Sequence, residues 1–263
     1  MTFRILIPLL IVGCGAANAA TPTPQHCSPW QLKQLLGDTN AKIVDSACKT
    51  LPNHKDTVLA SAIYRLQQDE QSSYIWQVML LDAHSHNIIG QYQDFLDEDT
   101  STRIDSGVIW LDTAAYQLAD NNRAFGVRLA IGYWPQYAQG GSDKFLTLFN
   151  EQPQEGKLVP LMQSLPLFFW TEISAANDYS ERTSAKTNGY VQVLESSSHG
   201  LRDLQLVYPE NIEHWQESSG DIHTQKGRTY KTILKYDGNQ YPLGEWDDIP
   251  SKMWYHRDPS SAK

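Results

Sequence analysis

The sequence lacks any apolar run long enough to cross a membrane as a helix. Its richest apolar segment, residues 165–176, is interrupted by Thr171 and Glu172, whereas a spanning helix needs about 20 consecutive apolar residues. Basic residues are also scarce, because 21 Lys and Arg stand against 30 Asp and Glu, and phosphate binding needs a concentrated basic patch. We therefore expect no transmembrane segment in the mature chain and no nucleic acid among its partners.

Motifs that assemble a catalytic nucleophile are missing as well. The chain has no G-x-S-x-G sequence, and the run Gly140-Gly141-Ser142 lacks the strand-to-helix setting that activates a serine. Sugar hydrolysis uses two carboxylates a few ångströms apart, and Glu172 with Glu195 is one of many acid pairs that a β protein of this size offers. The sequence leaves any catalytic residue unassigned.

Metal-binding patterns are weak. His84 and His86 lie two residues apart, which would place both imidazoles on one face of a strand, but the surrounding polar residues indicate a hairpin tip. An acidic run between residues 94 and 105 does not match a calcium-binding EF-hand, because Thr102 and Val108 occupy the positions that need Gly and Glu. We expect no metal and no cofactor.

The N-terminus has the three-part layout of a secretory signal peptide. Arg4 supplies the positive charge, residues 5–13 are almost wholly apolar, and Ala17-Asn18-Ala19 is a small-x-small cleavage site. The apolar run is too short for a membrane span. We therefore predict that residues 1–19 are a signal peptide, that the mature protein lies in the periplasm, and that residues 20–27 form a flexible leader.

A second interpretation of the same residues stays open. The run Ile11-Val12-Gly13-Cys14 resembles the bacterial lipobox, in which a small residue precedes the cysteine that becomes acylated. Lipidation of Cys14 would make the protein a membrane-anchored lipoprotein. Both interpretations place the protein outside the cytoplasm.

Cysteine counting agrees with an oxidising compartment. Removal or acylation of Cys14 leaves the even pair Cys27 and Cys48, which are too far apart for the close C-x-x-C spacing of zinc sites. We predict a disulfide between them, which would contribute on the order of 3 kcal/mol to stability.

One short helix is predicted directly after Cys27. Ser28 suits the N-cap and Pro29 the first helical position, while Leu32, Leu35 and Leu36 fall on one face. Gly37 is well placed to end the helix.

From about residue 58 onward the pattern becomes that of β-strands. Short segments rich in β-branched and aromatic residues are separated by polar turns. The predicted strands are residues 58–66, 74–81, 88–95, 108–111, 125–134, 144–149, 158–162, 167–173, 190–194, 204–208 and 229–236. The predicted fold is mainly β, an antiparallel sandwich or partly closed barrel with a short disulfide-tethered N-terminal helix, in one β-rich domain over residues 28–246. Residues 247–263 are predicted to form a frayed tail.

Two further expectations concern polar segments. Residues 177–189 and 209–227 are predicted to be long loops, which are either mobile or functional. Asp237-Gly238 is typical of a hairpin turn, and it predicts that residues 229–236 pair with residues 240–243.

Aromatic residues are the one abundant feature that suggests a binding surface, with eight Trp and thirteen Tyr in the chain. Tyr133, Trp134 and Tyr137 lie beside a predicted loop with Pro135 and residues 140–141. Such rings stack well on sugars or on a partner peptide, although core packing is the competing interpretation. We predict these three residues as a binding face.

The sequence therefore favours a non-enzymatic exported envelope protein that binds an envelope protein or a surface polysaccharide. Two alternatives remain: a glycan or cell-wall hydrolase that uses a carboxylate pair, and a periplasmic immunity or inhibitor protein whose acidic surface covers a basic active site. A deep cleft with two facing acids would favour the hydrolase.

Overall fold

A computed structural model describes residues 26–37, 41–52, 54–66, 73–176 and 180–244. The predicted signal peptide, Cys14, most of the predicted leader and the predicted tail lie outside these residues. Within them, no helix has the length and apolar character needed to cross a membrane.

The protein is mainly β, as the alternating pattern predicts, and every strand pairing in its two sheets is antiparallel. The elements are α1 (Pro29–Leu36), β1 (Ala41–Leu51), β2 (His54–Leu66), β3 (Ser73–Asp82), β4 (Ile88–Asp97), β5 (Ile109–Ala119), β6 (Asn122–Leu129), β7 (Gly140–Asn150), β8 (Pro160–Ala175), β9 (Glu181–Asn188), β10 (Tyr190–Ser198), β11 (Leu201–Gln216) and β12 (Ile222–Leu234).

The small sheet is a meander in the order β1-β2-β3-β4. Leu59 and Ile63 of β2 pack in the core toward the second sheet, while Ala60 and Ala62 of the same strand pack toward α1. Burial on both faces explains why β2 reads as a nearly continuous apolar run in the sequence.

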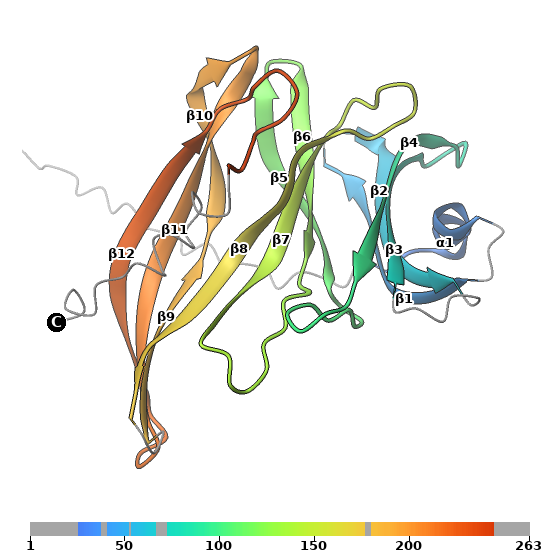
Figure 1. The fold of residues 1–263 in the computed structure, drawn as a ribbon. Helices are drawn as coiled ribbons and strands as arrows, with labels where there is room; N and C mark the ends of the chain where they lie inside the picture. Colours follow the sequence, from blue (N-terminus) through green and yellow to red (C-terminus); the bar gives the residue numbers. More distant parts are fainter. Residues whose placement is uncertain (1–25, 38–40, 53, 67–72, 177–179, 245–263) are drawn as a thin grey trace, which may run out of the picture.

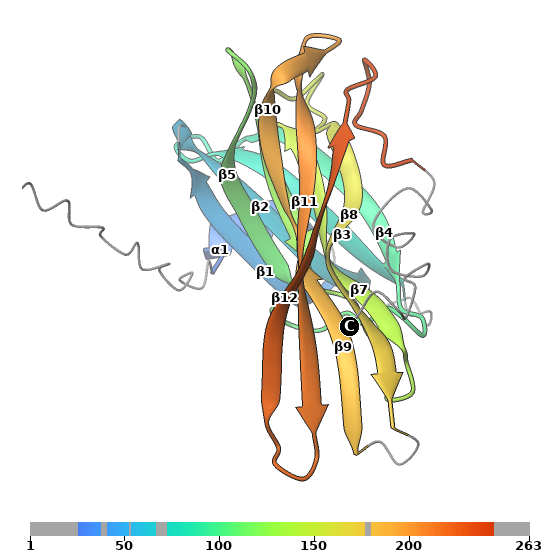
Figure 2. The same cartoon turned by 90° about the vertical axis from the view of Figure 1, so that its left-hand side faces the viewer.

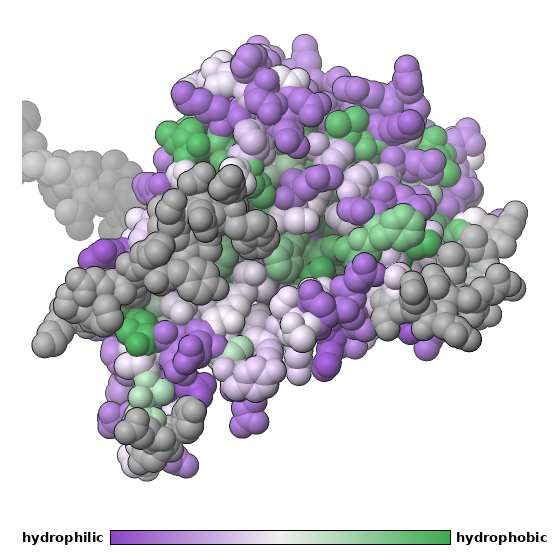
Figure 3. Space-filling model, viewed as in Figure 1, coloured by the Kyte–Doolittle hydropathy of each residue, from purple (hydrophilic) through white to green (hydrophobic). Residues whose placement is uncertain are grey.

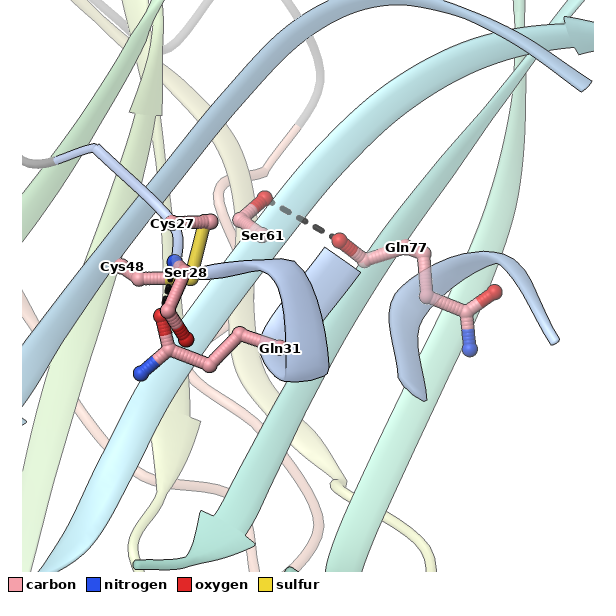
Figure 4. Close-up of a disulfide and its surroundings, with 6 residues drawn as sticks. All are labelled: Cys27, Ser28, Gln31, Cys48, Ser61 and Gln77. Carbon is pink, nitrogen blue, oxygen red and sulfur yellow. Dashed lines mark hydrogen bonds between the residues drawn. A yellow bond between two sulfur atoms is a disulfide. The ribbon is translucent and has the colours of Figure 1, made fainter. Parts of the chain in front are cut away.

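The N-terminal helix and its disulfide match the prediction. Ser28 is the N-cap and donates its backbone N–H to Gln31 Oε1 at 2.7 Å, and Gly37 follows the last turn at a φ of 61°. Cys27 and Cys48 are bonded, which ties the start of α1 to β1 (Figure 4). The helix buries Leu35 against the small sheet.

The large sheet has the order β10-β11-β9-β8-β7-β6-β5, with β12 on the other side of β11. The long β11 pairs with β10 along its first half and with β9 along its second half. The sheet curls until β5 contacts β10 and β11, which makes it a half-barrel. Figures 1 and 2 show the β11–β12 hairpin extending past the small sheet.

Two apolar cores hold these layers together. One lies inside the half-barrel and contains Leu118, Leu146 and Leu204. The other lies between the two sheets, where Phe125 and Phe149 of the large sheet meet residues of β2 and β3. The order of layers is therefore half-barrel, small sheet and helix (Figure 1).

Several sequence predictions about loops and strand pairing are wrong. The predicted loops 177–189 and 209–227 contain β9, the end of β11 and the start of β12, and β1 was also missed. On β9, for example, the small side chains of Ala185 and Thr187 are buried on one face while Arg182 and Lys186 are partly exposed on the other, so the strand shows little apolar alternation. The predicted pairing of residues 229–236 with 240–243 is also wrong, because β12 pairs with β11.

Candidate binding site

The face of the large sheet that points away from the half-barrel core is called the outer face here. Within the part of the chain that the structure describes, other elements cover it over only part of its width. The small sheet packs against it over β5, β6 and β7, through residues that include Leu111, Val127 and Phe149. Over β8, β9 and β11 the outer-face side chains are partly exposed. On β8, for example, Phe169 is buried in the half-barrel core, whereas the flanking Phe168 and Trp170 point the other way.

A cavity of about 580 Å³, called the outer-face cavity here, lies on this uncovered part. Its aromatic and charged lining comes from β8, β9, β11 and the segment that precedes β7. The principal lining residues are Trp134, Phe168, Trp170, Arg182, Lys186, Glu213 and Trp215. A volume of this size falls in the range of about 300–1,000 Å³ that small-ligand sites occupy.

Three aromatic rings form one wall of this cavity. Trp134 stacks on Phe168 with ring centroids 5.9 Å apart and an interplanar angle of 27°, and its centroid lies 5.8 Å from that of Trp170. Gly141 allows this packing, since a Cβ at that position would lie 2.8 Å from Trp170 Nε1 and 2.9 Å from Trp134 Cε3. Trp170 Nε1 is buried and has no hydrogen-bond partner among the described residues.

Two ion pairs involve charged residues of the cavity lining, in which Arg182, Lys186 and Glu213 take part directly. Lys186 Nζ lies 2.5 Å from Glu213 Oε2, and Arg182 Nε lies 3.2 Å from Glu172 Oε2. The strand register explains the alignment, because Glu172 of β8 lies opposite Ser184 of β9, which lies opposite Glu213 of β11. Paired residues on neighbouring strands share a face, so both acids belong to the outer face and both are held by cations.

Residues 130–139, called the Trp134 loop here, are anchored at both ends. Tyr133 donates its N–H to Ser101 O at 2.8 Å, and Arg103 donates to Ile131 O at 2.9 Å. At the other end, the backbone N–H of Glu172 donates to Gln139 O at 2.8 Å. The loop therefore bridges the β4–β5 connection and β8, and these backbone bonds fix Trp134 in place.

A second cavity, of about 680 Å³, lies on the other side of the Trp134 loop. This inter-sheet cavity is bounded by Trp76 and Leu96 of the small sheet, by Phe145 of β7 and by residues 100–102. Figure 3 shows the recessed apolar surface between the two sheets on this side of the molecule, with hydrophilic side chains around it. Trp134, Pro135 and Ala138 line both cavities.

The structure places all three residues of the predicted binding face along the inter-sheet cavity. Tyr133 lies under the guanidinium of Arg103, with Cζ 4.1 Å from the ring centroid, and the side chain of Tyr137 is exposed. Trp134 alone also reaches the outer-face cavity. Tyr133, Trp134 and Tyr137 therefore share one loop, but they do not present one flat surface.

The other candidates from the sequence do not come together. His84 Nε2 lies 2.9 Å from Asp56 Oδ1, whereas the ring of His86 stacks on Trp30 at 4.1 Å. Within the described residues no group of three or more His, Cys, Asp or Glu side chains is arranged to hold a metal ion.

Glu172 of β8 and Glu195 of β10 lie near opposite ends of the long strand β11. Glu195 lies where β10 pairs with the start of β11, while Glu172 aligns through Ser184 with Glu213 near the end of β11. The pairing of Glu172 with Glu195 as catalytic carboxylates is therefore excluded by the register.

Sequence reasoning missed Arg182, Lys186, Glu213 and Trp215, because their segments were predicted to be loops. A period of two is nevertheless present, since Arg182 and Lys186 fall on one face of β9 and Glu213 and Trp215 on one face of β11. This alternation of charged and small residues was the available signal. Comparison of the chain with family models, curated proteins and solved structures finds no match.

Proposed function

We propose that this is an exported envelope protein that binds a surface polysaccharide in the outer-face cavity, without a catalytic step. The observation that carries the proposal is the combination of four aromatic side chains with the charged side chains of Arg182, Lys186 and Glu213 in one cavity on a strand-paired sheet. The aromatic residues are Trp134, Phe168, Trp170 and Trp215.

The chemistry of a sugar fits both parts of this lining. The C–H faces of a pyranose ring are apolar enough to pack on an aromatic face, which is large and rigid and carries a negative quadrupole. Its hydroxyl groups form hydrogen bonds, and bonds to charged side chains such as Arg182, Lys186 and Glu213 are the stronger ones. An acyl chain fits this lining less well, because it packs on the aromatic rings but offers no group that could form hydrogen bonds with the charged side chains.

The dimensions favour a polymer segment over a folded protein partner. A stable protein–protein interface buries about 1,200–2,000 Å² in total and has a broad contact surface, whereas the outer-face cavity is concave and of small-ligand size. A short stretch of a glycan chain can enter such a cavity while the rest of the polymer stays in solvent.

Two features support the extracytoplasmic location. The N-terminal sequence has the layout of a secretory signal, with Cys14 as the alternative lipidation site. The disulfide between Cys27 and Cys48 is a bond that persists in oxidising compartments such as the periplasm.

The experiment compares Trp170→Ala with Trp110→Ala. Both remove a Trp from the large sheet, but Trp110 lies on β5, outside both cavities, and is 53% exposed. The probes are purified glycan fragments of peptidoglycan and neutral hexose oligosaccharides, titrated calorimetrically against the mature protein. We expect one class to bind, Trp170→Ala to weaken its binding at least tenfold, and Trp110→Ala to leave it unchanged. Absence of binding by both classes, or equal weakening by the two variants, would overturn the proposal.

One observation favours hydrolysis as a second candidate. Glu172 and Glu213 flank Ser184 on the outer face, so two acids share one face with backbones two strand spacings, or about 9.6 Å, apart. Glycoside hydrolysis uses a pair of carboxyl groups. Incubation of the same glycans with wild type and with the Glu172→Gln and Glu213→Gln variants, followed by measurement of glycan length, discriminates hydrolysis from binding. Shortening of the glycan by wild type alone would establish a hydrolase and contradict a purely binding role.

A further inference from the structure

The two cavities on either side of the Trp134 loop belong to the same face of the molecule. On β8 and β7 the outer-face row runs through Trp170, Phe168 and Asp143, and Phe145 continues it at the inter-sheet cavity. Because the cavities share Trp134, Pro135 and Ala138 as a common wall, a chain that leaves one cavity enters the other by crossing a single loop.

From this continuity we infer that the ligand is an extended glycan of several linked units that occupies both cavities and crosses the Trp134 loop. The inference rests on the proposed function and specifies its ligand. Each cavity alone has the volume of a small-ligand site, so the two together hold more than one short segment. Aromatic rings accompany the whole path, from Trp170 through Trp134 to Tyr137.

The crossing point is a fixed structure and not a lid. Gly132 donates its N–H to Asp143 Oδ1 at 2.8 Å, and a Cβ at Gly132 would lie 2.2 Å from Ser142 O. This close contact holds the loop against β7, the bond from Glu172 to Gln139 holds it against β8, and the bond from Tyr133 to Ser101 holds it against the β4–β5 connection. A preformed path lowers the conformational cost of binding a flexible polymer.

The polar groups of the inter-sheet cavity specify the charge of the units that enter it. Its polar lining is dominated by hydroxyls, among them those of Ser101, Thr102, Ser142 and Thr147, and Asp94 is the charged side chain among its described lining residues. Hydroxyl groups both donate hydrogen bonds to sugar hydroxyls and accept hydrogen bonds from them. The carboxylate of Asp94 repels anions. In the outer-face cavity, by contrast, Lys186 is paired with Glu213 of the same lining, and Arg182 is paired with Glu172, which lies outside the lining.

The ligand class is therefore a polymer of neutral or amino-bearing hexoses. Polymers of uronic acids or of phosphodiester-linked units place an anion on every residue, and such an anion at the inter-sheet cavity would meet Asp94 without a compensating cation in the cavity lining. The net charge of the whole chain, −9, acts in the same direction.

The experiment measures affinity against ligand length. The probes are di-, tetra- and hexasaccharides of N-acetylglucosamine, of a neutral hexose and of galacturonic acid, titrated against the mature protein. The variants are Trp170→Ala for the outer-face cavity and Tyr137→Ala for the inter-sheet cavity; Tyr137 is 85% exposed, so its truncation leaves the fold intact. Asp94→Asn tests the charge selection.

For wild type we expect at least a tenfold gain in affinity from the disaccharide to the hexasaccharide of a neutral or amino sugar, and weaker binding of the galacturonate series. Trp170→Ala weakens all lengths, whereas Tyr137→Ala removes most of the gain with length and leaves the disaccharide unaffected. Asp94→Asn narrows the difference between neutral and anionic series.

The two levels of failure are distinguishable. Binding that depends on Trp170 but does not increase beyond the disaccharide, or that Tyr137→Ala weakens equally at every length, overturns the two-cavity path and leaves the proposed function standing. Preference for the galacturonate series overturns the ligand class. Absence of binding by every probe overturns the proposed function and the path together.

Discussion

The covered and uncovered parts of the large sheet's outer face have the same backbone and opposite side-chain chemistry. Where the small sheet lies over β6 and β7, the outer face is built from apolar groups such as Val127 and Phe149, both fully buried. Over β8, β9 and β11, where no other described element packs on it, the same face carries Trp170, Lys186 and Glu213. The difference between the two parts shows that coverage by a neighbouring layer, and not strand pairing, decides which side chains one face of a sheet can carry.

The largest expected difference between the two parts is in stability. Phe149→Ala removes a ring that is fully buried and contacts Trp76, Tyr92 and Phe125, so it should lower the free energy of unfolding by about 3–5 kcal/mol. Phe168→Ala truncates the matched ring in the uncovered part, where water replaces it, and should cost less than half as much. Urea unfolding of both variants measures the difference, and equal losses would show that the uncovered part is as tightly packed as the covered one.

The stability of the helix α1, which packs on the small sheet, is expected to depend on the disulfide that ties it to β1. Replacing Cys27 and Cys48 with Ser removes a disulfide that closes a loop of 21 residues in sequence separation, and the expected loss is about 3 kcal/mol. Urea unfolding of the double variant, with reduced wild type as the control, measures it. Glycan affinity at the outer-face cavity should not change, since α1 packs on the opposite side of the small sheet; a weakened affinity would contradict the separation of the two parts.

A smaller effect is expected where the cavity wall meets β7. Gly141→Ala inserts a Cβ within 3 Å of both Trp134 and Trp170, and the rings must move, at an expected cost of about 1–3 kcal/mol. The double variant Gly141→Ala with Trp170→Ala removes the close contact with Trp170 and gives Trp134 room to move, so its loss of stability in thermal unfolding should be smaller than the sum of the two single losses. Strict additivity would show that the rings do not pack on Gly141.

The smallest expected effect concerns a buried carboxylate at the junction of the sheets. The side chain of Glu151 is 7% exposed, its Oε1 lies 3.4 Å from Arg123 Nε, and its Oε2 lies 3.3 Å from His54 Nε2. Burial raises the pKa of the Glu151 carboxyl above its ordinary value, and Arg123 and His54 offset this rise in part.

The pKa of a glutamate in the unfolded chain is about 4.3. Because folding raises the pKa of Glu151, its protonated carboxyl stabilises the fold fully below that pH, and this stabilisation is lost as the pH rises through the folded pKa. Glu151→Gln cannot ionise, so it should be slightly more stable than wild type at neutral pH. Thermal unfolding from pH 4 to 8 should show that the extra stability of Glu151→Gln over wild type decreases as the pH is lowered. A variant less stable than wild type at neutral pH would mean that the pairing with Arg123 outweighs the cost of burial.

Local signals determined the N-terminal part of the structure. The run from Cys27 to Gly37 holds its own cap, its first-turn proline and its terminating glycine, and these act over a few residues whatever surrounds them. The pairing of Cys27 with Cys48 followed from counting cysteines. Strands buried on both faces, such as β2 and β3, were equally visible, because burial forces an apolar sequence.

The candidate site was visible only in fragments. The aromatic residues of the Trp134 loop stand out in composition. The outer-face cavity, which Trp134 lines, also needs Arg182, Lys186 and Glu213, and these come from segments whose sequences resemble polar loops. A strand that faces solvent on one side and buries Ala185 and Thr187 on the other has little apolar periodicity to detect.

The sequence by itself determined that the protein is mainly β, where its one predicted helix begins and ends, and which cysteines are bonded, because propensity, capping and cysteine number are properties of short stretches of chain. Only the tertiary structure decided which face of β8 is buried, that β11 pairs with β9 along one half and β10 along the other, and that two cavities meet at the Trp134 loop. These features depend on contacts between residues far apart in sequence, and such contacts form because the half-barrel and the small sheet must bury their apolar faces together.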